Sequence, residues 1–227
     1  MRLRSIALPV VLAFAAAFAL PTSAQSASTQ CSIVMPTKVA IGAAKVTTPI
    51  RVASNCAAND VDMAHWALEH ASGAYTPLDF VVSVGDTTQR LQWYDDDPMG
   101  TWTTSPEAAT TAADDPLVQN KTTTRVKYAA RLTTRATRTT HALSWAVTAS
   151  QWSGVAHAYV GRPRVAVSLQ YKPAGSSTWR YVKAVRTTST GLATVSLGSP
   201  KSGSYRLAVA ETASVWAAYS SPVRGTI

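Results

Sequence analysis

The sequence predicts an all-β protein made of two consecutive antiparallel β-sandwich domains. Three observations support this fold class. Thr and Val are frequent, short runs alternate apolar with polar residues, and Ser, Gly and Pro separate the runs. Turn signals spaced by roughly eight to twelve residues are typical of sandwiches. About 200 residues follow the expected leader, which suits two small domains or one large one.

Residues 1–24 are expected to be a cleaved signal peptide. Arg2 and Arg4 precede an apolar run, Ile6–Leu20, and the small residues of Thr22–Ala24 suit a peptidase. The run is too short to be a spanning helix. We therefore expect a secreted protein, extracellular or cell-wall associated, with no membrane span in the mature chain.

The two cysteines, Cys31 and Cys56, are expected to form a disulfide, because thiols of exported proteins usually pair. The bond would close a loop of about 26 residues and stabilise the fold by about 3 kcal/mol through loop entropy. It would tie the first strand to the second. Two cysteines and four scattered histidines provide too few ligands for a metal site.

Regular alternation identifies residues 123–227 as the clearer domain. In Ala142–Trp152, for example, Leu143, Trp145 and Val147 alternate with polar or small residues, so one face is apolar. Seven short strands separated by turns are typical of a sandwich. The strands expected here are Arg131–Arg138, Ala142–Trp152, Arg164–Tyr171, Trp179–Arg186, Leu192–Leu197, Tyr205–Val209 and Ser214–Val223.

Residues 123–227 also carry a resemblance to a known family. They contain V-S-L-Q-Y-K at Val167–Lys172, then Trp179–Val185, a T-x-x-x-G turn at Thr187–Gly191, and Tyr205-Arg206. This order resembles the Ig-like β-sandwich modules common in secreted actinobacterial proteins, where they are appendages of adhesins, hydrolases and other exported proteins. The resemblance implies a fold and a surface-associated biology and transfers no catalytic residue. The aromatics of the Tyr171–Lys183 hairpin are expected to be packing residues.

Residues 25–122 resemble that module less, and we expect them to form a second β-sandwich. Trp66 follows Cys56 by ten residues, as a core tryptophan would in an Ig domain, although the partner cysteine lies upstream. Asp60–Ala71 alternates as a strand does, and Ser105–Ala108 suggests a short helical turn in a loop. The expected strands are Ser32–Val39, Thr48–Ser54, Met63–Glu69, Leu78–Val84 and Thr88–Trp93.

Charge is divided sharply between the domains. Residues 25–122 hold 5 Lys and Arg against 11 Asp and Glu, a net of −6, whereas residues 123–227 hold 14 against 1, a net of +13. The basic domain should attract polyanions such as wall teichoic acids, phospholipid surfaces, anionic polysaccharides or extracellular DNA. No motif supports sequence-specific nucleic-acid recognition. Alternatively, the charges serve solubility or dock on the acidic domain. Arg180, Lys183 and Arg186 are candidate ligand-binding residues.

Two acidic runs in the first domain suggest a second kind of site. Asp95, Asp96 and Asp97, and further on Asp114 and Asp115, offer loop oxygens of the kind that calcium binds, although neither run matches the spaced calcium-loop motif. Solvated loop charges are the alternative. The indoles that flank the first run could form a stacking platform for sugars. These two tryptophans are Trp93 and Trp102.

No catalytic constellation stands out. The G-x-S-x-G, H-E-x-x-H and glycine-rich phosphate-loop motifs are missing from the sequence. His65 and Glu69 share one face of a strand and His70 points the opposite way, which favours an exposed strand face over an acid–base site. We expect a non-enzymatic envelope-associated binding protein with no cofactor besides the candidate calcium. The alternatives are a carbohydrate-binding module protein with its site in the first domain and, third, an extracellular hydrolase accessory protein or enzyme.

Overall fold

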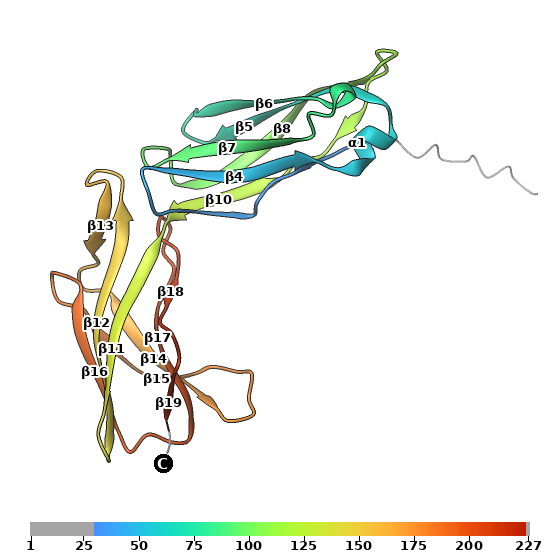
Figure 1. Cartoon of the computed structure of the whole chain (residues 1–227). Helices are drawn as coiled ribbons and strands as arrows, with labels where there is room; N and C mark the ends of the chain where they lie inside the picture. Colours follow the sequence, from blue (N-terminus) through green and yellow to red (C-terminus); the bar gives the residue numbers. More distant parts are fainter. Residues whose placement is uncertain (1–29, 226–227) are drawn as a thin grey trace, which may run out of the picture.

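A computed structural model of the chain describes residues 30–225, which form two β-sandwiches that meet at an angle (Figure 1). The all-β, two-sandwich fold class is therefore confirmed. The expected signal peptide, residues 1–24, lies outside the described residues. Within residues 30–225, no helix has the length and apolar character that crossing a membrane requires.

The first sandwich packs a sheet with the strand order β2-β4-β7 against a sheet with the order β3-β10-β8-β5-β6. Neighbouring strands are antiparallel except β3 and β10, which pair in parallel. The strands are β2 (Ile33–Val34), β3 (Lys38–Ile41), β4 (Lys45–Val52), β5 (Val61–His70), β6 (Tyr75–Val81), β7 (Thr88–Tyr94), β8 (Gly100–Thr111) and β10 (Thr123–Tyr128). A short parallel pair, β1 (Gln30–Cys31) and β9 (Val118–Gln119), lies beside them.

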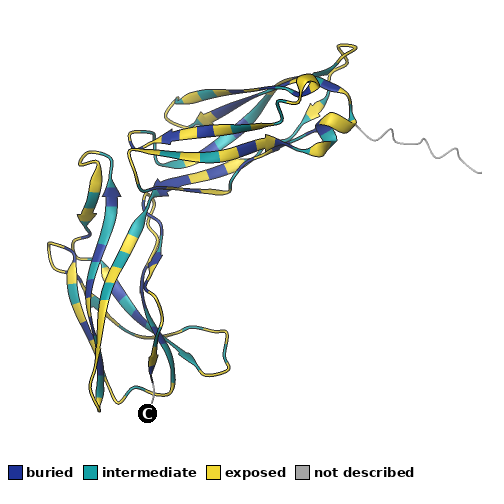
Figure 2. Ribbon diagram, in the orientation of Figure 1, coloured by how far each residue is buried: buried dark blue, intermediate teal, exposed yellow. Residues whose placement is uncertain are grey.

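The core of the first sandwich is built around aromatic rings. Trp66 contacts Phe80 edge-on with 6.2 Å between ring centroids, and Trp93 contacts Trp102 in the same way at 5.5 Å. All four side chains are buried. The alternation of buried and exposed residues that predicted the strands is visible along most of them (Figure 2).

Local structure differs from expectation at two places in this domain. The segment Ser105–Ala108 lies inside β8 and pairs with β5, so the expected helical turn is wrong. Its proline is accommodated because the β5 register shifts between His65 and Trp66, opposite Pro106, which has no backbone N–H to donate. The Cys31–Cys56 disulfide is present, but it joins β1 to the short helix α1 (Ser54–Ala58), which follows β4.

The second sandwich also has two sheets. In one, β12 pairs with β11 along one edge and with β13 and β16 along the other; the second has the order β15-β14-β17, with β18 and β19 both paired to β17. The strands are β11 (Ala130–Arg138), β12 (Ala142–Ser153), β13 (Ala158–Gly161), β14 (Ala166–Pro173), β15 (Arg180–Arg186), β16 (Leu192–Gly198), β17 (Gly203–Val209), β18 (Ala218–Tyr219) and β19 (Val223–Gly225).

The junction between the sandwiches is short and well packed. β10 still belongs to the first sandwich, through Tyr128, although the second domain was expected to begin at residue 123; β11 starts after one further residue. Trp152, at the end of β12, packs into the core of the first sandwich. Trp216 donates its indole N–H to the carbonyl oxygen of Val39 in β3 at 2.8 Å. These contacts join the two cores directly.

Candidate functional site

The stacking platform expected around Trp93 and Trp102 does not exist in the structure. Both side chains point into the core, with 2% and 3% of their surface exposed. The Trp93 indole N–H donates to Thr48 Oγ1 at 2.9 Å, and that of Trp102 donates to the carbonyl oxygen of Pro98 at 3.0 Å. Since neither ring presents a face to solvent, these residues cannot stack on a sugar.

The first acidic run belongs to the junction. Asp95 is only 4% exposed, and its Oδ2 accepts the indole N–H of Trp152 at 3.0 Å and lies 2.8 Å from Nδ1 of His157. Burial alone would raise the pKa of Asp95, but the hydrogen bonds from His157 and Trp152 outweigh it and hold the pKa below its ordinary value. Asp95 therefore holds the second domain in place.

The remaining aspartates do not assemble a cation site. Asp97 Oδ2 accepts the backbone N–H of Tyr94 at 2.7 Å, which closes the β7–β8 turn, while Asp114 and Asp115 are exposed in the turn that follows β8. Among residues 30–225, no group of three or more His, Cys, Asp or Glu side chains is placed to hold a metal ion. The geometry does not support the expected calcium site at Asp95, Asp96 and Asp97.

The three candidate cations of β15 do not share one surface. Lys183 pairs with Leu169, whose side chain is buried, so it points toward the gap between the sheets, where its ammonium group bonds the carbonyl oxygen of Ser196. Arg186 donates to the carbonyl oxygen of Arg164 at 3.0 Å, and Arg180 is exposed at the strand end. An inward-pointing lysine protects a sheet edge, so Lys183 serves the fold.

A different set of side chains does share one surface, on the outer side of the β15-β14-β17-β18 sheet. Val167 and Leu169 point into the core, so Gln170 and Lys172 on the same strand point outward. Strand pairing places Gln170 between Tyr181 of β15 and Arg206 of β17. We call this set the cationic–aromatic face; its members are Gln170, Lys172, Trp179, Tyr181, Arg206 and Tyr219.

Arg206 is the centre of the cationic–aromatic face. Its guanidinium carbon lies 4.2 Å from the ring centroid of Trp179 and 4.3 Å from that of Tyr219, and its Nε donates to Gln170 Oε1 at 2.8 Å. The ammonium group of Lys172 lies 5.2 Å from the Trp179 ring. Arg206 is half-buried, and among the described residues it has no carboxylate partner.

The expectation that the hairpin aromatics are packing residues holds for Tyr171 and is wrong for Tyr181. Tyr171 packs against the core, with its ring 4.9 Å from that of Tyr205. Tyr181 is 68% exposed on the opposite side of the sheet, as is Tyr219 at 55%. A register shift between Leu169 and Gln170 brings Tyr181 to that side, and such a bulge leaves no clear mark in the residue pattern.

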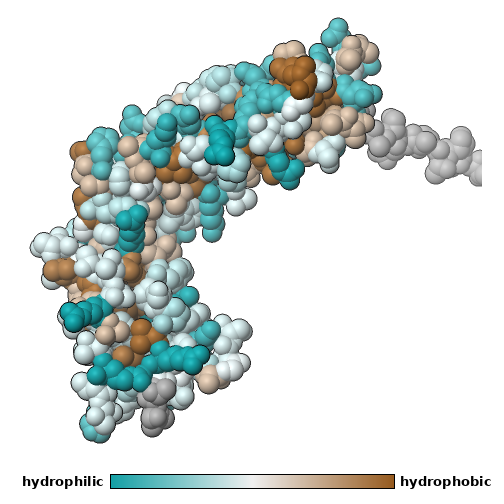
Figure 3. Space-filling view, viewed as in Figure 1, coloured by the Kyte–Doolittle hydropathy of each residue, from teal (hydrophilic) through white to brown (hydrophobic). Residues whose placement is uncertain are grey.

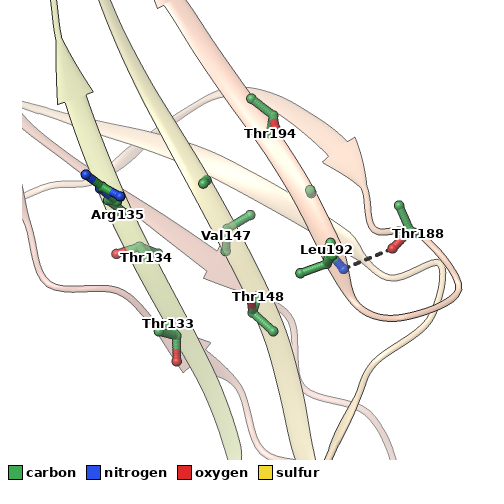
Figure 4. A pocket seen from close by; sticks show the side chains of 10 residues that line it. Thr133, Thr134, Arg135, Val147, Thr148, Thr188, Leu192 and Thr194 are labelled. Atoms are coloured by element: carbon green, nitrogen blue, oxygen red, sulfur yellow. Dashed lines mark hydrogen bonds between the residues drawn. The ribbon is translucent and has the colours of Figure 1, made fainter.

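The outer surface of the other sheet of the second domain carries mainly small and hydroxyl-bearing side chains around a shallow pocket. The pocket lies over β11, β12 and β16, lined mainly by threonine and alanine; the Leu192 backbone N–H donates to Thr188 Oγ1 at 3.1 Å beside it (Figure 4). Arg135 is the one titratable side chain of this lining. With neither a histidine nor a carboxylate in the lining, no threonine hydroxyl there has a base to activate it.

Carboxylates of the first domain gather on the outer side of β5, β6 and β8. Asp79 Oδ1 lies 2.7 Å from His65 Nδ1, and Glu69 accepts the hydroxyl of Ser105 at 2.6 Å. The Tyr75 hydroxyl donates to Glu107 at 3.1 Å, and this bond raises the pKa of Tyr75. His65 and Glu69 thus lie on one outward face as expected. On the side of the molecule in view, apolar residues form only small separate patches (Figure 3).

Comparisons with known proteins yield only distant similarities. No protein-family model matches the sequence, and no curated protein matches it. Among solved structures, a cytokine receptor complex is similar over 86% of this chain and 95% of its own, at 9% identity and a TM-score of 0.40. A red sea bream transglutaminase is similar over 86% of this chain and 31% of its own, at 11% identity and a TM-score of 0.36. The D0-D1 domain of intimin is similar over 86% of this chain and 97% of its own, at 16% identity and a TM-score of 0.27. Similarities this low carry no information about a ligand.

Proposed function

We propose that this protein is a secreted, non-enzymatic binding protein of the cell envelope, and that its second domain attaches it to anionic surface polymers. The observation that carries the proposal is the charge of residues 130–225, which contain 12 Lys and Arg and a single carboxylate, Glu211. Such a surface attracts polyanions over about a Debye length and gains further free energy by releasing their counterions.

The single carboxylate does not neutralise this surface. Glu211 accepts from Lys127 Nζ at 2.6 Å and lies 3.3 Å from an Arg125 nitrogen, and both cations belong to the first sandwich. Among the described residues, neither Arg135 nor Arg206 pairs with any carboxylate of the first domain. These two arginines are therefore not neutralised by docking on the acidic domain, which supports attraction of an external polyanion.

Retention on wall material in a salt series tests the proposal. We expect the mature protein to bind cell-wall preparations at low ionic strength and to be released as salt approaches about 0.5 M, where the Debye length has fallen to roughly 4 Å. A neutral polysaccharide of similar length is the matched control and should retain little protein at any salt concentration. Retention that persists in high salt, or equal retention on the neutral polymer, would contradict an electrostatic attachment.

A further inference from the structure

The environment of Arg206 is unusual for a surface arginine. An arginine on a solvated strand face normally extends into water or pairs with a carboxylate, so that its charge is either solvated or compensated. Arg206 is instead half-buried between the rings of Trp179 and Tyr219, at 4.2 and 4.3 Å, with no carboxylate partner among residues 30–225. The face holds a positive charge that lacks a counter-charge from the described residues.

The guanidinium group is also fixed in orientation. The two rings restrain its plane, and the bond from Nε to Gln170 at 2.8 Å restrains its rotation. Its two terminal nitrogens form no hydrogen bond to another described residue, so their N–H groups remain as donors. A guanidinium that presents its fork in this way matches the two oxygens of a planar carboxylate or of a phosphate, and little side-chain entropy is lost when it binds.

The neighbours of Arg206 favour one of these ligand classes. Tyr219 lies within 4.3 Å of the charge, and Tyr181 stands in the same cross-strand row, separated from Arg206 by Gln170. Both tyrosines are more than half exposed. Exposed rings of this kind pack against the apolar faces of sugars. In a uronic acid the carboxylate is bonded directly to the sugar ring, so the charge and the ring face must be bound side by side.

Nucleic acid fits this arrangement less well. A sugar separates each phosphate from its base, so phosphate and stacking sites should lie farther apart than Arg206 and Tyr219 do. In addition, the guanidinium already occupies one face of Trp179 and one face of Tyr219, which leaves fewer open ring faces for bases. A polyol phosphate without rings would leave the exposed tyrosines without a partner.

We propose that the cationic–aromatic face binds a polysaccharide that carries carboxylates on its pyranose rings. Arg206 takes one carboxylate through its two terminal nitrogens, Lys172 supplies a second positive charge beside Trp179, and Tyr181 and Tyr219 contact sugar rings on either side. This proposal rests on the proposed function and specifies the polymer that the basic domain attaches to.

The test uses the full mature chain, with polygalacturonate as the probe and polyphosphate and single-stranded DNA as competing polyanions. Arg206→Gln should weaken polygalacturonate binding by roughly tenfold or more, since it removes charge-assisted hydrogen bonds. Arg206→Lys, which keeps the charge and loses the fork, should weaken it by several fold. The matched control is Arg135→Gln, the same loss of charge on the opposite sheet, and should change the affinity by less than about twofold.

A second variant distinguishes loss of the binding site from misfolding of the variants at the half-buried Arg206. Tyr181 is largely exposed, so Tyr181→Ala should leave the melting temperature unchanged and still weaken polygalacturonate binding by about threefold or more. Equal losses in Arg206→Gln and Arg135→Gln would show diffuse attraction and overturn the site while leaving the proposed function standing. Tighter, Arg206-dependent binding of polyphosphate or DNA would overturn the ligand class. Failure to bind any polyanion at low salt would refute the proposed function itself.

Discussion

The junction offers the sharpest test of how the two sandwiches are held together, and Trp216 is one of the second-domain residues that join them. Trp216 is 9% exposed, and its indole N–H donates to the carbonyl oxygen of Val39 at 2.8 Å. Three cations lie over its ring, at 5.1 to 5.2 Å from the centroid. They are Lys38, Arg125 and Lys127. We therefore consider two substitutions, Trp216→Ala and Trp216→Phe.

The expected magnitudes follow from what each substitution removes. Truncating a buried tryptophan to alanine costs about 3 to 5 kcal/mol, because transfer free energy is lost and a cavity remains. Trp216→Phe keeps a ring at the same place and removes the N–H, together with part of the attraction for the cations. One hydrogen bond contributes about 1 kcal/mol, and a solvent-accessible cation–π contact about 0.5 to 1 kcal/mol. We expect Trp216→Phe to cost about 1 to 2 kcal/mol.

Urea unfolding of the mature chain, followed by far-ultraviolet circular dichroism, measures both free energies. Because Trp216 joins the two cores, we also expect Trp216→Ala to unfold the sandwiches in separate transitions where the parent chain unfolds in one. Trp179→Phe is the matched control for Trp216→Phe. Because Trp179 is a half-buried residue of the outer face, this substitution should lower the free energy of unfolding much less. The reasoning fails if Trp216→Ala lies within about 0.5 kcal/mol of the parent protein, or if it is no more costly than Trp216→Phe.

Three further predictions concern stability. Trp66→Phe should cost about 1 to 3 kcal/mol more than Trp145→Phe by urea unfolding. Both indoles are fully buried, but the Trp66 N–H donates to a backbone carbonyl at 3.0 Å, whereas the Trp145 N–H has no partner among the described residues. Equal costs would contradict this. Replacing Cys31 and Cys56 by serine should lower the free energy of unfolding by about 3.5 kcal/mol, from the entropy of a loop with a separation of 25 residues, and reductant should then have no further effect. The pKa of Asp95 is lowered in the folded protein, so ionised Asp95 stabilises the junction at pH values above the ordinary aspartate pKa. This stabilisation is lost as the pH falls through the folded pKa, and the fluorescence of Trp152 should change over the same pH range. Asp95→Asn should abolish this change in fluorescence.

Most strands were predictable because alternation is a local property of the sequence. Ala142–Trp152 and Leu192–Leu197 lie almost where their patterns placed them, as β12 and β16. β8 was missed because Ser105-Pro106-Glu107 carries helix-start signals, which pairing with β5 overrides. β13 has only four residues, too few to show a period. Pairing with a neighbouring strand can thus override the local conformational propensity of a segment.

The cationic–aromatic face was less predictable because it depends on which strands are neighbours. Trp93 and Trp102 flank an acidic run in the sequence, a pattern that suggests a surface site, yet both rings point into the core. Trp179, Arg206 and Tyr219 lie far apart in the sequence and meet only because β17 pairs with both β14 and β18. Which aromatic and charged side chains lie together on one face can be told only once the sheet order and register are known.

The carboxylate that the second domain uses at the junction pairs with cations of the first sandwich. A carboxylate on the outer side of the second domain would compete with any anionic ligand for its arginines, and Glu211 is the one carboxylate in residues 130–225. A hydrogen bond from Lys127 lowers the pKa of Glu211, so it stays ionised and bound to the first sandwich. The junction thus occupies the one side-chain carboxylate that residues 130–225 contain. The polyanion binding that we propose and the contacts that hold the two sandwiches together consequently draw on separate groups.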